Sequence, residues 1–213
     1  MAERVVLVHG LWLTSISMWR LGQRLRAAGF VVHRFSYPTT RRDPSTNARA
    51  LASYLSRLGD GPFHLVCHSL GGLLARHLLC VEPQAPVARL VLLGTPQHGS
   101  RVASAFMRWP GGRALLGHSV EAGLLGELPP WRGQRELGVI AGDLPLGVGR
   151  VLCPLPAPHD GTVSVAETRL EQMTDHIVLD VSHTGLLISA AVADQVKHFL
   201  AHGRFLHPPA ATA

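Results

Sequence analysis

Six short apolar runs alternate with segments of helical periodicity along this 213-residue chain. The runs lie at residues 5–8, 31–35, 63–66, 90–93, 137–141 and 177–181. Nearly continuous apolar runs are typical of strands that are covered on both faces. The alternation predicts an α/β fold with a mostly parallel, roughly six-stranded sheet, right-handed crossovers and flanking helices.

Four helices are predicted between and after these runs. The first covers about residues 17–28 and stops at Gly29, and the second begins near Pro44 and ends by Gly59. The third follows Ser69, and the last spans about 185–201 with apolar residues at helical spacing. Ligands bind at the carboxyl ends of strands in such sheets, so reactive residues should directly follow strands.

Length and composition bound the class of protein. A length of 213 residues suits a single domain, residues 1–213. Hydrophobic residues make up 46% of the chain and charged residues 16%, which is ample for a hydrophobic core. The net charge of +6 comes from dispersed arginines, so nucleic-acid binding is not expected. Weak attraction to an anionic membrane surface is compatible with this charge. The sequence does not specify an oligomeric state.

The three cysteines and the N-terminal segment indicate which cofactors and which cellular compartment to expect. Cys67, Cys80 and Cys153 have neither disulfide-framework nor zinc-site spacing, and no phosphate-cradling glycine loop occurs. We therefore expect no metal and no cofactor. The chain enters its first strand without a signal-peptide pattern and has no uncharged apolar run of about 18 residues. These features predict a cytoplasmic protein.

The segment Cys67-His68-Ser69-Leu70-Gly71-Gly72 joins an apolar strand to an apolar helix. A serine hydroxyl needs a base and an oxyanion-stabilising pocket to act as a nucleophile. A sharp strand-to-helix turn exposes the side chain and directs helical N–H groups at the reacting carbonyl. We predict that Ser69 is a nucleophile; the alternative is a serine N-cap. Cys67 replaces the first glycine of G-x-S-x-G, so strain or relaxation is expected there.

An acid and a base follow the later strands. His183 comes after the sixth run and is the predicted general base, while Asp160 follows the fifth run and is predicted to orient the imidazole. The chain order serine, aspartate, histidine is that of the α/β-hydrolase triad. The competing carboxylates are Asp143, which a turn role explains, Asp175, which precedes the sixth run, and Asp180.

The remaining site predictions concern the oxyanion and the substrate. Gly10 ends the first strand, so Leu11 N–H and Leu70 N–H are the predicted oxyanion donors. Residues 101–135 fit no strand and read as a helical cap over an acyl pocket, or as apolar packing onto the core. The expected pocket residues are His9, Trp12, His68, Thr95, Pro96 and Trp109.

Five segments together resemble the α/β-hydrolase superfamily, and within it the small bacterial lipases and esterases. They are residues 5–11, 68–72, 93–100, 159–163 and 181–185. The resemblance implies a trimmed core without the opening antiparallel strands of larger members. It also implies hydrolysis of a small-molecule or lipid-like carboxylic ester through an acyl-enzyme. A thioesterase or amidase with the same triad is the alternative, and a non-catalytic interaction protein is a third reading.

Overall fold

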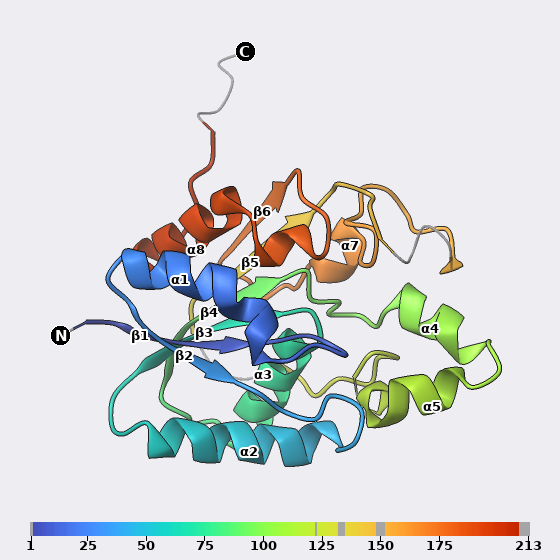
Figure 1. The fold of residues 1–213 in the computed structure, drawn as a ribbon, viewed down its shortest axis with the longest axis horizontal. Coiled ribbons are helices and arrows are strands. Elements are labelled where there is room, and N and C mark those ends of the chain that lie inside the picture. The colour runs from blue at the N-terminus through green and yellow to red at the C-terminus, as the bar shows by residue number, and fades with distance from the viewer. Residues whose placement is uncertain (1, 122, 132–134, 148–151, 209–213) are drawn as a thin grey trace.

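The computed structural model describes residues 2–121, 123–131, 135–147 and 152–208. Six strands form one sheet in the order β2-β1-β3-β4-β5-β6, and every neighbouring pair is parallel (Figure 1). This confirms the predicted fold class. The strands are β1 Arg4–Val8, β2 Val31–Phe35, β3 Phe63–His68, β4 Val87–Leu93, β5 Leu137–Gly142 and β6 Asp175–Leu179.

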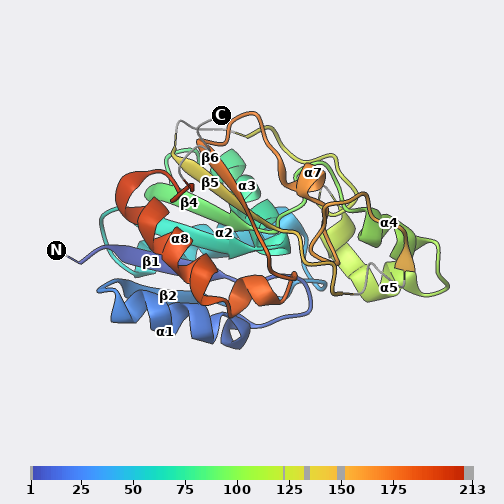
Figure 2. The ribbon, with the colours of Figure 1, turned by 90° about the horizontal axis from the view of Figure 1, so that it is seen from above.

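Helices cover both faces of the sheet (Figure 2). Successive residues of a strand point to opposite faces, so β1 supplies two separate cores. Val5 and Leu7 pack with α1 (Trp19–Ala27) and α8 (Ala190–His202). Val6 and Val8 pack with α2 (Pro44–Arg57) and α3 (Leu70–Val81). This double coverage explains why the strands read as continuous apolar runs.

Local capping chemistry sets the helix boundaries. Asp43 accepts the Thr46 N–H at 2.8 Å, and Pro44 occupies the first turn of α2. The two predicted helices at 17–28 and 185–201 each begin as a separate 3₁₀ turn, η1 (Ser15–Met18) and η3 (Gly185–Leu187). Ser189 lies after η3 and forms the N-cap of α8. The single helix predicted at 185–201 is therefore two elements, η3 and α8.

The prediction for the last strand was offset by two residues. β6 runs over Asp175–Leu179 and not over 177–181, because this edge strand pairs only with β5 and tolerates polar residues at its start. Asp175 therefore lies in the strand and does not precede it. Its carboxylate accepts the Phe205 N–H at 2.7 Å and contacts the His207 ring, which gives it a structural role.

The segment after β4 lies beyond the carboxyl ends of the strands (Figure 2). It contains α4 (Arg101–Met107), α5 (Gly112–Leu116) and η2 (Gly117–Val120). Residues 122 and 132–134 of the predicted cap lie outside the described residues. A further short helix, α7 (Val165–Thr168), precedes β6. None of the helices in the described part of the chain has the length and apolar character needed to cross a membrane.

Candidate active site

Ser69 occupies the turn between β3 and α3 with an unusual backbone conformation. Its φ is 53° and its ψ is −122°, a combination that side-chain-bearing residues rarely adopt. The Ser69 N–H donates to the Leu93 carbonyl at 2.9 Å, and Thr95 Oγ1 donates to the Ser69 carbonyl at 3.0 Å. Its side chain makes no capping hydrogen bond, so the hydroxyl does not serve as a helix N-cap.

The residues flanking Ser69 allow this turn to form. A Cβ on Gly71 would lie 2.7 Å from the carbonyl oxygens of Val8 and His9, so a larger residue would separate α3 from the end of β1. Cys67 is fully buried in β3, and burial raises the pKa of its thiol. The positive φ of this turn falls on Ser69 and not on Cys67.

Asp160 and His183 form a buried pair. Asp160 Oδ2 lies 2.7 Å from His183 Nδ1, and the Asp160 carbonyl accepts the His183 N–H at 2.9 Å. The other carboxylate oxygen accepts the N–H groups of Thr162 and Val163 at 2.9 and 2.7 Å. A carboxylate so placed accepts from Nδ1–H, which leaves His183 Nε2 as the free basic nitrogen.

A second histidine lies against this pair. The His68 and His183 rings are 4.6 Å apart, and His68 Nε2 donates to the His183 carbonyl at 3.0 Å. Desolvation, and next the proximity of His183, holds the pKa of His68 well below its ordinary value. His68 therefore stays neutral, with its proton on Nε2 and a buried acceptor at Nδ1.

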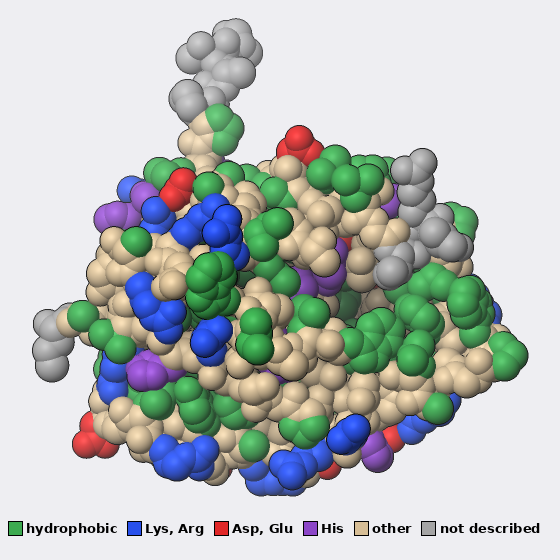
Figure 3. All heavy atoms as spheres, viewed as in Figure 1, with side chains coloured by type: hydrophobic (Ala, Val, Ile, Leu, Met, Phe, Trp, Pro, Cys, Tyr) green, Lys and Arg blue, Asp and Glu red, His purple; other side chains and the backbone are tan. Residues whose placement is uncertain are grey.

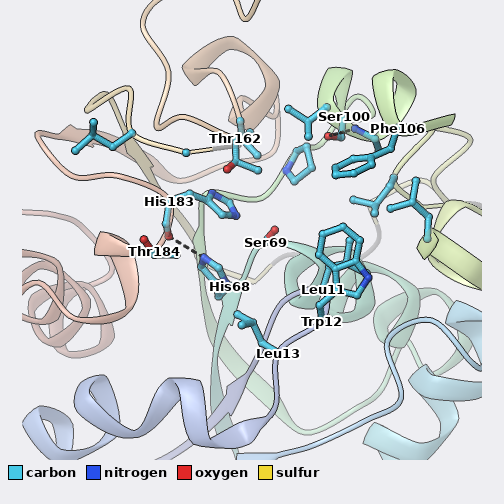
Figure 4. A pocket seen from close by; sticks show the side chains of 18 residues that line it. Leu11, Trp12, Leu13, His68, Ser69, Ser100, Phe106, Thr162, His183 and Thr184 are labelled. Carbon is cyan, nitrogen blue, oxygen red and sulfur yellow. Dashed lines mark hydrogen bonds between the residues drawn. The ribbon is translucent and has the colours of Figure 1, made fainter. Parts of the chain in front are cut away.

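A cavity of about 240 Å³ opens in front of these groups (Figure 4). Ser69, His68 and His183 are among the side chains that line it. Its walls are apolar and come partly from α4 and α5 and the loop after them, through Val102, Ala103, Phe106, Leu116 and Leu124. Figure 3 shows histidine side chains within a hollow bordered by hydrophobic ones. The cavity can hold an apolar chain next to a hydroxyl and an imidazole.

Half of the predicted pocket residues line this cavity. Trp12, His68 and Pro96 do so. The other three predicted residues are not among those that line the cavity, for reasons of packing. His9 stacks on Tyr37 away from the cavity, Thr95 is buried and bonds the Ser69 carbonyl, and Trp109 is 53% exposed.

Leu11 and Leu70 carry the two backbone N–H groups that the sequence predicts as oxyanion donors. Leu11 follows β1 and lines the cavity. Leu70 is the first residue of α3, and the N–H groups of a first helical turn have no intrahelical acceptor.

Of the competing carboxylates, Asp143 is exposed in the loop after β5, where its N–H donates to the Leu179 carbonyl. Neither Asp143 nor Asp180 takes the place of Asp160 on His183 Nδ1.

Sequence reasoning missed several lining residues. They are apolar side chains without a chemical signature: Leu13, Val102, Ala103, Phe106, Leu116, Leu124 and Leu146. The spacing of 102, 103 and 106 on one helical face was the available signal. It could not distinguish a face that lines a cavity from one that packs on the core.

Comparisons with known proteins agree with this fold. The model of a family described as the alpha/beta hydrolase family matches residues 5–212. The chain belongs to the alpha/beta hydrolase family. Lipase LipV of Mycobacterium tuberculosis is 48% identical over 58 residues, which are 26% of this chain and 22% of that lipase. The aligned stretch thus spans about a fifth of the curated relative.

Two solved structures of hydrolases share the architecture. The mature lipase BlEst2 of Bacillus licheniformis superposes with a TM-score of 0.80 at 21% identity, covering 95% of this chain and 92% of that one. The carboxylesterase CesB of Bacillus subtilis has a TM-score of 0.60 at 15% identity, covering 93% and 84%. At these identities the likeness shows the α/β-hydrolase fold.

Gly94 offers a test of how tightly the Asp160–His183 pair is packed. Its φ is +56°, and an added Cβ would lie 3.0 Å from Asp160 Oδ2 and 3.1 Å from His183 Nδ1. Gly29, with φ +93°, has nothing within 4 Å of such an atom. We expect Gly29→Ala to lower the free energy of unfolding by about 1–2 kcal/mol from backbone strain alone. Gly94→Ala should lower the free energy of unfolding by at least about 1 kcal/mol more than Gly29→Ala, because the added methyl group crowds the Asp160–His183 pair. Urea unfolding measures both values. Equal losses would contradict the tight packing around this pair.

Proposed function

We propose that this α/β-hydrolase cleaves carboxylic esters through an acyl-enzyme on Ser69. The observation that carries the proposal is the buried Asp160–His183 hydrogen bond at 2.7 Å, beside a serine that the turn holds in a strained conformation. Ser69 and His183 both line one cavity with apolar walls. The names of the relatives, a lipase and a carboxylesterase among them, favour an oxyester over a thioester or an amide.

The proposed reaction has two half-reactions. His183 Nε2 takes the proton of Ser69 Oγ as the oxygen attacks the ester carbonyl carbon. The N–H groups of Leu11 and Leu70 stabilise the resulting oxyanion, and Asp160 stabilises the imidazolium. Collapse expels the alcohol, which receives its proton from His183. Water then attacks the acyl-enzyme with His183 as base again, and the acid leaves.

The segment at 101–135 serves in this proposal as a cap that forms the acyl compartment. Ala103 and Phe106 of α4 and Leu116 of α5 face the cavity, so a chain bound there would be removed from water. Each buried methylene of a substrate is worth about 0.8 kcal/mol. We expect a small-molecule or lipid-like ester as substrate. A cytoplasmic location and weak contact with a membrane surface stay predictions from composition.

Replacing the nucleophile gives the first test. Ser69→Ala should reduce turnover of a p-nitrophenyl ester on the order of 10⁴- to 10⁶-fold, because no oxygen remains to form the acyl-enzyme. Circular dichroism should show an unchanged fold, since the Ser69 side chain makes no capping bond. A fluorophosphonate should label the unchanged protein and not the variant. Retained turnover would refute Ser69 as the nucleophile, and no labelling of the folded protein would favour a non-catalytic role.

Asp160 is tested against a carboxylate on a neighbouring loop. Asp160→Asn removes the charge that holds the His183 tautomer, and kcat should fall about 10⁴-fold. Asp143→Asn is the matched control, because Asp143 is exposed and does not bond His183. Its kcat should be unchanged. A large loss of kcat in Asp143→Asn, or no loss in Asp160→Asn, would show that Asp160 is not the carboxylate that orients His183.

Ala103 tests the acyl compartment. Ala103→Phe should fill part of the cavity and lower kcat/KM for octanoate esters at least about 10-fold relative to acetate esters, since chain burial is lost. Ser104→Phe places the same ring on the outer, exposed face of α4 and should leave this ratio unchanged. An unchanged octanoate-to-acetate ratio in Ala103→Phe would place the acyl chain outside this cavity. Matched thioesters run in parallel should be the poorer substrates.

A further inference from the structure

His9 is a fully buried histidine that the proposed chemistry leaves without a role. It follows β1, and its ring stacks on Tyr37 at a centroid distance of 4.6 Å and an angle of 23°. The Tyr37 N–H donates to His9 Nε2 at 3.3 Å, and the Tyr37 hydroxyl donates to the His9 carbonyl at 3.0 Å. Because Nε2 accepts a hydrogen bond, the ring proton of neutral His9 lies on Nδ1.

That Nδ1–H has one acceptor, and it is part of the oxyanion loop. His9 Nδ1 lies 3.0 Å from the Gly10 carbonyl oxygen, to which the Leu13 N–H also donates at 3.3 Å. The Gly10–Leu11 peptide is trans, so its carbonyl and its N–H point in opposite directions. Fixing the Gly10 carbonyl on His9 therefore fixes the Leu11 N–H on the side away from His9.

Gly10 also lies beside the nucleophile. A Cβ built on Gly10 would lie 3.0 Å from Ser69 Cβ, so this part of the loop lies against the Ser69 side chain. The next peptide is held as well. Trp12 has a strained φ of 57°, and its N–H donates to Thr39 Oγ1 at 3.2 Å. Both peptides that flank Leu11 thus have hydrogen-bond partners outside the cavity.

We propose that His9 is a positioning residue that orients the Leu11 N–H toward the oxyanion through the Gly10 carbonyl. The proposal rests on the proposed Ser69 chemistry and adds a role that neither the nucleophile nor the Asp160–His183 pair supplies. Burial lowers the pKa of His9, which keeps the ring in the neutral form that accepts at one nitrogen and donates at the other. A doubly protonated ring would set two donors, His9 Nε2–H and the Tyr37 N–H, against each other.

Two substitutions distinguish the hydrogen bond of His9 Nδ1 from that of His9 Nε2. An asparagine amide nitrogen can take the place of Nδ1 and keep the bond to Gly10, whereas a glutamine amide reaches the position of Nε2 and leaves the Gly10 carbonyl without its side-chain donor. Loss of an oxyanion donor lowers kcat about 10²- to 10³-fold. We expect His9→Gln to lose kcat on the order of 10²-fold with little change in KM, and His9→Asn to retain most of it.

His64→Gln is the matched control. His64 is likewise buried and its Nδ1 accepts a backbone N–H, that of Arg89 at 3.3 Å, but it lies at the amino end of β3. This variant should lose stability to urea without losing kcat. A trifluoromethyl ketone, which forms a tetrahedral adduct with serine, should bind His9→Gln more weakly by the same factor as kcat falls.

The inference is overturned if His9→Asn and His9→Gln lose equal activity, if the loss appears in KM, or if His64→Gln shares it. Nitrogen NMR of the unsubstituted protein is independent of whether the variants fold. A His9 ring protonated on Nδ1 supports the proposal, and one protonated on Nε2 overturns it. Retained turnover in Ser69→Ala would instead refute the proposed function, so the two failures are distinguishable.

Discussion

The approach of α3 to the end of β1 is the constraint on which the site depends. β3 lies between β1 and β4, so the turn after β3 is surrounded by the ends of two strands. Gly71 lets the first turn of α3 pass within contact of the Val8 and His9 carbonyls. The same approach brings Gly10, which precedes Leu11, against the Ser69 side chain, and Leu11 and Leu70 carry the two proposed oxyanion donors. The positive φ of Ser69 is sustained because Leu93 at the end of β4 and Thr95 just after it hydrogen-bond the N–H and the carbonyl of Ser69.

The proposed base, His183, comes from the other half of the sheet and has its own set of contacts. Asp160 and His183 lie on the loops after β5 and β6, and they bond each other through both side chain and backbone. Gly94, at the end of β4, leaves the space through which this pair reaches the centre of the sheet. The proposed nucleophile and its base therefore have independent supports, and a change that weakens one support need not move the other.

Chain order and strand ends were enough to select Asp160 and His183, which bond each other, and to place His183 on the same cavity as Ser69. Every parallel strand ends at the same edge of the sheet, so position after a strand restricts where a side chain can lie. The same reasoning could not place the His9 ring, because it cannot tell which way a ring turns. A histidine directly after a strand can face the cavity or the layer behind it, and stacking on Tyr37, 28 residues away, decides between them. The start of β6 was missed since an edge strand can begin with polar residues.

The neighbouring rings of His183 and His68 differ in their hydrogen-bond partners, and this difference decides which of them can carry a positive charge. His183 has a carboxylate on Nδ1, so it has a partner that stabilises a positive charge. His68 has a backbone carbonyl on Nε2 and an unpartnered Nδ1, and burial holds its pKa far below its ordinary value. A cationic His68, 4.6 Å away, would oppose the imidazolium that the proposed reaction forms on His183. Because burial disfavours a proton on His68, the proposed reaction places the Ser69 proton on His183.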